Sequence, residues 1–80
     1  MNLKQARRKE WHVRTSGHYV EIFAMYMDRR GYSYSFVVHE FPMYVSPRHP
    51  SKRELMSHAR YIANLHNTQL KLKAAKEVGE

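Results

Sequence analysis

Three prolines, at positions 42, 47 and 50, divide the sequence into two halves of different character. Proline lacks a backbone N–H and its ring fixes φ, so neither a strand ladder nor a helix can continue through residues 42–50. Aromatic and β-branched residues are frequent before this segment, whereas good helix formers follow it. We therefore predict a β-rich N-terminal half and a helical C-terminal half, joined by an exposed, extended connection.

Three strands are predicted within residues 11–41. Trp11 to Thr15 alternates apolar and polar residues, and Ser16-Gly17 is typical of a turn. The run from His18 to Met27 leads into a polar loop, Asp28 to Gly31, whose glycine can adopt positive φ. The next run begins with period-two alternation, which places four large apolar residues on one face: Tyr32, Tyr34, Phe36 and Val38.

The pairing of the second and third strands has two solutions. If the loop is Asp28 to Gly31, Met25 faces Tyr34 across the ladder and one apolar face results. A three-residue loop with a bulge would shift the pairing by one residue and place Ile22 and Tyr26 on that face instead. We favour the first register.

Ser51 is a natural N-cap with Glu54 three residues later, and a helix is predicted from Ser51 to about Lys76. One stripe of this helix can cover the apolar face of the sheet: Leu55, Met56, Ala59, Ile62, Ala63, His66 and Leu70. A neighbouring stripe is polar and cationic and is expected to face solvent or a partner: Arg53, Arg60, Asn64, Asn67 and Lys71.

These elements predict one α+β domain over residues 1–80, of order α-β-β-β-α, in which a three-stranded antiparallel sheet packs on the long C-terminal helix. Residues 1–10 are expected to form a short helix or a basic arm. The lack of cysteine favours the cytoplasm, and neither a signal peptide nor a membrane span is predicted. Aromatic residues left outside the core, with Tyr26 and Tyr44 as candidates, would permit a homodimer.

Charge gives the strongest functional indication in the sequence. Fourteen Lys and Arg residues against seven Asp and Glu give a formal net charge of +7, which favours an anionic partner. Basic groups occur at Arg7-Arg8-Lys9, in the Arg29-Arg30 loop, at Arg48-His49 and along the C-terminal helix. We predict a non-enzymatic module that binds nucleic-acid phosphates, RNA or DNA, through seven residues: Arg29, Arg30, Arg48, Lys52, Arg53, Arg60 and Lys71.

No cofactor or metal site is predicted. The sequence has six histidines but no His-x-x-x-His or His-Glu-x-x-His spacing, and no cysteine to complete a site. Paired carboxylates and a phosphate-binding glycine loop are also missing from the sequence, so an enzyme is not expected.

Two families share features with this sequence. The predicted element order, the helix start Ser51-Lys52-Arg53 and the spaced Ala59 and Ala63 resemble the double-stranded RNA-binding domain, although that family's third basic helix residue falls on Met56. This resemblance implies an RNA contact at the helix start. The stretch from Trp11 to His18 is similar to the Trp…Val-Arg…Gly-Ser-His stretch of the HicA-type toxins, with glycine and serine exchanged and the spacing two residues shorter. That likeness implies a ribonuclease with His18 as its base.

Two further possibilities stay open from the sequence. A three-stranded sheet with one helix is also similar to the arm-binding domains of phage integrases, which contact DNA through the sheet. A small basic chain rich in aromatic residues is also compatible with a phage or mobile-element accessory protein that binds and inhibits a host protein complex, as anti-CRISPR proteins do.

Overall fold

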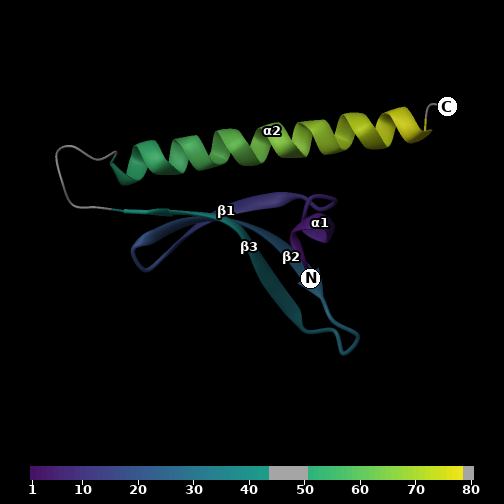
Figure 1. The fold of residues 1–80 in the computed structure, drawn as a ribbon, viewed down its shortest axis with the longest axis horizontal. Coiled ribbons are helices and arrows are strands. Elements are labelled where there is room, and N and C mark those ends of the chain that lie inside the picture. Colours follow the sequence, from purple (N-terminus) through teal and green to yellow (C-terminus); the bar gives the residue numbers. More distant parts are fainter. Residues whose placement is uncertain (44–50, 79–80) are drawn as a thin grey trace.

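The computed structural model describes residues 1–43 and 51–78 of the 80-residue chain. Its elements are α1 (Leu3–Ala6), β1 (Trp11–Ser16), β2 (Tyr19–Met27), β3 (Ser33–Pro42) and α2 (Lys52–Val78). The three strands form one antiparallel sheet of order β1-β2-β3, and α2 lies across one side of it (Figure 1). The predicted α+β fold of order α-β-β-β-α is confirmed. The prediction that no strand includes residue 42 was wrong: Pro42 is the last residue of β3 and lies opposite Tyr19, which is possible because β3 is an edge strand.

Both hairpin turns depend on a glycine with positive φ. Gly17, at φ 58°, is the first residue of the two-residue turn between β1 and β2, a position that glycine occupies in type II′ turns. His18 is the second residue of this turn, one position before β2. At the other hairpin the Gly31 N–H donates to the Asp28 carbonyl (3.1 Å), and the Asp28 N–H donates to the Tyr32 carbonyl (3.0 Å). Gly31 has φ 88°, so this is a three-residue loop with a bulge.

This loop overturns the favoured strand register. Tyr26, and not Met25, lies opposite Tyr34, so the alternative pairing of the two strands is the observed one. A second irregularity follows along the strand: Ile22 pairs with His39 and Phe23 with Val37, which leaves Val38 as an extra residue in β3. The predicted alternation from Tyr32 therefore ends at Val38.

The core lies between α2 and the β1–β2 half of the sheet. Val20 and Ile22 on β2 are fully buried against Ala59 and Ala63 on α2, four residues apart on one helix face. Their small side chains allow the helix to approach the sheet closely. Other members of the predicted apolar stripe surround this contact, which confirms it: Leu55, Met56 and Ile62. The Ser51 hydroxyl accepts from the Glu54 N–H (3.3 Å), as expected for the N-cap.

Trp11 connects four parts of the chain. Its indole N–H donates to the Ala6 carbonyl at the end of α1 (3.0 Å), and its ring stacks on His66 of α2 with centroids 3.6 Å apart. His39 of β3 contacts the same ring edge-on at 6.0 Å. Nε2 of His66 lies 2.8 Å from the Lys9 carbonyl, and because a carbonyl only accepts, Nε2 carries the proton. Trp11 thus fixes α1 and the following residues against α2.

Asn67 joins α2 to the outer edge of the sheet. Its Oδ1 accepts from the Trp11 N–H (2.8 Å) and its Nδ2 donates to the Trp11 carbonyl (3.0 Å). The side-chain amide therefore pairs with edge strand β1 as a neighbouring peptide group would. The prediction that Asn67 faces solvent or a partner was wrong, because its amide matches an unpaired strand edge.

Replacing Asn67 with Ala is expected to lower the free energy of unfolding by about 2 kcal/mol, because two part-buried backbone groups of Trp11 lose their partner. Chemical denaturation followed by circular dichroism measures this loss, and the Trp11 amide should exchange faster with solvent. Asn64→Ala is the matched control, since Asn64 is exposed one turn earlier, and it should change the stability by no more than about 0.5 kcal/mol. Equal effects of the two substitutions would contradict the role assigned to Asn67.

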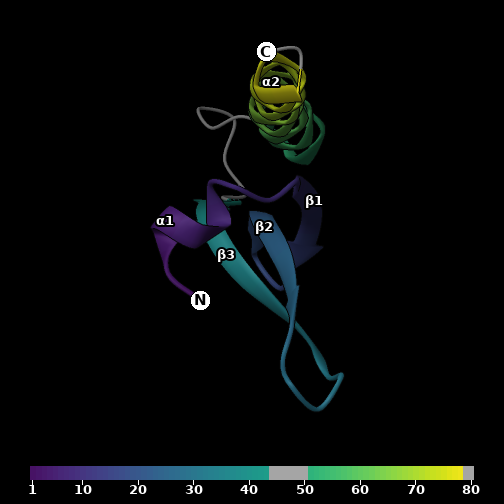
Figure 2. The ribbon, with the colours of Figure 1, turned by 90° about the vertical axis from the view of Figure 1, so that its right-hand side faces the viewer.

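The molecule is elongated. Its principal extents are 51 × 32 × 16 Å and its radius of gyration is 14.9 Å, against about 12 Å for a compact chain of this length. Seen along α2, the helix forms one layer and the sheet a second, with α1 beside the sheet (Figure 2). The β2–β3 hairpin extends away from α2, beyond the core (Figures 1 and 2). No helix in the described parts of the chain is long and apolar enough to cross a membrane.

Candidate functional site

A concave surface lies between the residues that follow α1 and the C-terminal half of α2. It consists of two cavities of about 530 and 320 Å³ that share Arg7, Leu70 and Lys73. We call this surface the cationic groove, with the lining residues Arg7, Arg8, Trp11, His66, Gln69, Leu70, Lys73 and Ala74. Trp11 and His66, whose rings stack on each other, therefore also line the groove.

A third cavity, of about 450 Å³, lies between the N-terminal residues and the β2–β3 hairpin. We call it the hairpin cavity; its lining residues are Met1, Gln5, Arg8, Lys9, Tyr26 and Met27. Arg8 lines both this cavity and the cationic groove. The two hollows therefore follow one another around α1, from the end of α2 to the hairpin.

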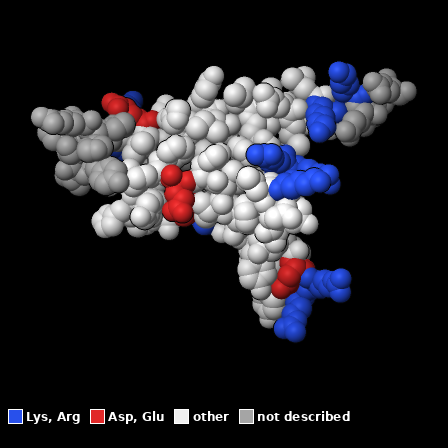
Figure 3. Space-filling view, in the orientation of Figure 1, with Lys and Arg blue, Asp and Glu red and all other residues white. Residues whose placement is uncertain are grey.

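All charged residues that line these hollows are cations: Arg7, Arg8, Lys9 and Lys73. Lys76 adds charge nearby in the last turn of α2, where the partial negative charge of the helix C-terminus stabilises cations. Figure 3 shows Lys and Arg gathered at this end of the molecule, and a separate group at the hairpin tip. Within the described residues the one ion pair is Arg14 with Glu21 (2.9 Å), away from the groove.

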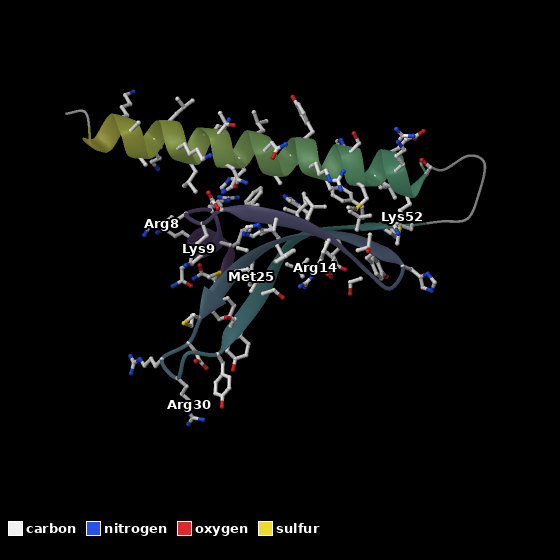
Figure 4. The ribbon with its side chains drawn as sticks, turned by 180° about the vertical axis from the view of Figure 1, so that it is seen from behind. Arg8, Lys9, Arg14, Met25, Arg30 and Lys52 are labelled. Carbon is white, nitrogen blue, oxygen red and sulfur yellow. The ribbon has the colours of Figure 1, made fainter. Side chains whose placement is uncertain are left out.

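Most of the predicted phosphate-binding residues do not gather in one place. Arg29 and Arg30 are exposed in the β2–β3 loop, and Lys52 and Arg53 lie in the first turn of α2. Figure 4 shows Arg30 and Lys52 at two separate ends of the molecule, both distant from Arg8 and Lys9. Arg48 and Tyr44 lie outside the described residues.

The predicted cationic stripe of α2 is exposed but widely spaced. Arg53, Arg60 and Lys71 share one side of the helix, yet the rise per residue separates their Cα atoms by about 10 and 16 Å. Separate cations on a convex helix can each contact a phosphate, but they do not enclose one. The groove, by contrast, brings cations from two segments to one concave surface.

Arg7, Arg8 and Lys9 form a basic group in the sequence that was not part of the predicted site, and Lys73 was not predicted either. Lys73 follows His66 by seven residues and Leu70 by three, so it continues the stripe of α2 that faces the rest of the molecule. This position on the helix was the feature of the sequence from which Lys73 could have been predicted. Bringing Arg7 next to Lys73 also required the residues that follow α1 to lie beside α2, and Trp11 holds them there by stacking on His66.

The histidines serve different contacts. His12 lies against Phe23 (5.6 Å between ring centroids), His39 and His66 contact Trp11, and His58 contacts Phe41. Among residues 1–43 and 51–78 there is no group of three His, Asp or Glu side chains that could hold a metal ion. The groove itself is lined by cations, by the Gln69 amide and by two rings, and its cations suit anion binding.

Comparison with family models, with curated proteins and with solved structures finds no match for this chain.

Proposed function

We propose that this protein is a non-enzymatic nucleic-acid-binding module whose cationic groove and hairpin cavity hold the phosphate backbone. The observation that carries the proposal is the lining of these neighbouring hollows, where two arginines and two lysines occur without a carboxylate. Lys and Arg that neutralise phosphates release condensed counterions, which favours binding to a polyanion. Arg7 and Arg8 can also donate two parallel hydrogen bonds to one phosphate.

A net charge of +7 supports the same partner, because the field of the whole protein draws a polyanion towards it. The exposed cations outside the groove are expected to add weaker contacts. Lys71 and Arg60 lie on α2, and Arg29 and Arg30 on the hairpin tip. In this arrangement the groove fixes the position of the backbone and the other cations extend the contact.

Charge reversal at the groove is expected to abolish most binding. The variant Arg7→Glu with Arg8→Glu should weaken binding at least tenfold at about 50 mM salt, because two phosphate contacts are replaced by repulsion. Fluorescence anisotropy with labelled single strands and duplexes of RNA and DNA measures the affinity. For the parent, affinity should fall steeply between about 50 and 200 mM salt.

The matched control reverses two cations at the other end of α2. Lys52→Glu with Arg53→Glu changes the net charge equally, and acidic residues suit a helix N-terminus, so the fold should be kept. This variant should retain most of the affinity. Equal losses in the two variants would show that only net charge matters, and the groove would lose its assigned role.

A second candidate function is binding to a host protein, supported by a different surface. Tyr61, Leu65 and Leu72 form an exposed apolar stripe on the side of α2 opposite the core. Side chains of this kind are typical of protein interfaces. If the parent binds none of the nucleic acids at low salt, binding to a host protein is favoured. A pull-down that compares the parent with Leu65→Asp tests it, and the variant should capture less of the partner.

A further inference from the structure

The β2–β3 hairpin carries three tyrosines near its tip, and one of them lines the hairpin cavity. Tyr26 lines that cavity with Arg8 and Lys9, and the Tyr34 ring stacks on Tyr26 with centroids 5.4 Å apart and planes inclined by 24°. Tyr34 is still 44% exposed, and Tyr32, two residues before it, is 62% exposed. Aromatic surface is therefore available next to cations on the same part of the molecule.

The stacked pair is built before any ligand arrives. Tyr26 is half-buried between the hairpin and α1 and supports the Tyr34 ring from one side. The strand pairing of Tyr26 with Tyr34 fixes both backbones. Because the ring is already held, a ligand that stacks on Tyr34 would lose little side-chain entropy on binding.

Exposed aromatic rings near cations favour a single-stranded nucleic acid over a duplex. In a duplex the bases stack on each other and present only their edges, whereas an unpaired base offers a flat face to an aromatic ring. Single-strand-binding proteins combine a positive groove for the backbone with aromatic rings for the bases. The cationic groove and the hairpin cavity supply the first of these features, and Tyr34 and Tyr32 supply the second.

We infer that the ligand of this site is a single-stranded nucleic acid, with its phosphates along Arg7, Arg8 and Lys9 and unpaired bases stacked on Tyr34 and Tyr32. The inference rests on the proposed function and adds the class of nucleic acid and the residues that select it. Base stacking is tolerant of sequence, so little sequence preference is expected.

The test compares oligonucleotides of about 12 nucleotides, within the roughly 4–16 that a single-strand-binding module covers. Anisotropy is measured with labelled oligo-dT, oligo-U and a mixed-sequence duplex of equal length, so that the DNA and RNA arms identify the sugar. The parent should bind single strands at least fivefold more tightly than the duplex. Tyr34→Ala should weaken single-strand binding by about 5- to 150-fold, the equivalent of 1–3 kcal/mol per stacked base, and Tyr34→Phe should bind as the parent does.

Two controls separate stacking from other effects. Tyr61→Ala removes a 66% exposed tyrosine on the outer side of α2 and should leave the affinity unchanged. Tyr34→Ala should keep the parent's salt dependence because no phosphate contact is lost, whereas Arg8→Gln should reduce the slope of log affinity against log salt by about 0.7. Tyr32→Ala is a second variant, more exposed than Tyr34, and it too should weaken single-strand binding.

The outcomes distinguish the two proposals. Duplex binding as tight as single-strand binding, or unchanged affinity in both tyrosine variants, would overturn the inference while the Arg7 and Arg8 reversal still tests the proposed function. Absence of all binding by the parent at low salt would overturn both.

Discussion

Replacing Trp11 with Ala is expected to lower the free energy of unfolding by about 3–5 kcal/mol, the cost usual for removing a large packed aromatic side chain. The change removes the ring that stacks on His66 and the indole N–H that bonds the Ala6 carbonyl. A chain of this size has only a few kcal/mol of stability in total. The variant should therefore be largely unfolded near room temperature.

Chemical denaturation followed by far-ultraviolet circular dichroism measures this loss, since the variant lacks the protein's single tryptophan and cannot be followed by its fluorescence. Trp11→Phe should be intermediate, because it keeps a ring against His66 but loses the bond to Ala6. Tyr61→Ala serves as control: this aromatic residue is mostly exposed and its removal should cost less than about 1 kcal/mol. A Trp11→Ala variant as stable as the Tyr61→Ala variant would contradict the central role of Trp11.

Ile22→Ala is expected to be the second most damaging change, at about 2–5 kcal/mol. Ile22 is the largest fully buried side chain among residues 1–43 and 51–78 and packs in the cluster that contains Ala59 and Ala63. These neighbours are short, so they cannot extend into the cavity left behind. The free energy of unfolding from urea denaturation gives the size of the effect.

Leu65→Ala is the matched control for Ile22→Ala. It also shortens a branched aliphatic residue, but Leu65 is 48% exposed on the outer side of α2. Alanine has a slightly higher helix propensity than leucine, so the change should be within about 0.5 kcal/mol. A loss at Leu65 as large as that at Ile22 would mean that the outer side of α2 is covered in solution, against the packing described here.

The long helix and its buried side were predictable because the pattern is local and repeated. From Ser51 onward the apolar positions recur at helical spacing, and the structure packs Ala59 and Ala63 of that stripe against the sheet. The cap at Ser51 also follows from a local rule. An apolar pattern repeated over several helical turns is compatible with few other secondary structures.

The register of the hairpin was not predictable in the same way, because one residue decides it. Asp28 to Gly31 fits both a four-residue loop and a three-residue loop with a bulge, and the choice is visible only in the hydrogen bonds of Asp28 and Gly31. Asn67 was also predicted wrongly. Its polar side chain suggested an exposed position, but the amide lies opposite the Trp11 backbone and forms hydrogen bonds with it.

The candidate site was the hardest part to predict from the sequence, because its residues come together only in the folded chain. The predicted cations, such as Lys52 and Arg30, were chosen by charge alone, and the fold sets them apart (Figure 4). Arg7 and Lys73 are 66 positions apart in the sequence, yet both line the cationic groove. They become neighbours because the residues that follow α1 lie beside α2, where the Lys9 carbonyl and the Trp11 ring contact His66.

The extra residue Val38 changes which face of the sheet the following side chains of β3 point to. Phe41 and Tyr34 are seven residues apart, an odd number, so in a regular strand they would point to opposite faces. The bulge cancels this difference: Phe41 pairs with Val20 in the core, and Tyr34 pairs with Tyr26 on the same face further out. One inserted residue therefore lets a single strand supply the core with one part of its length and present aromatic rings beside the hairpin cavity with the other.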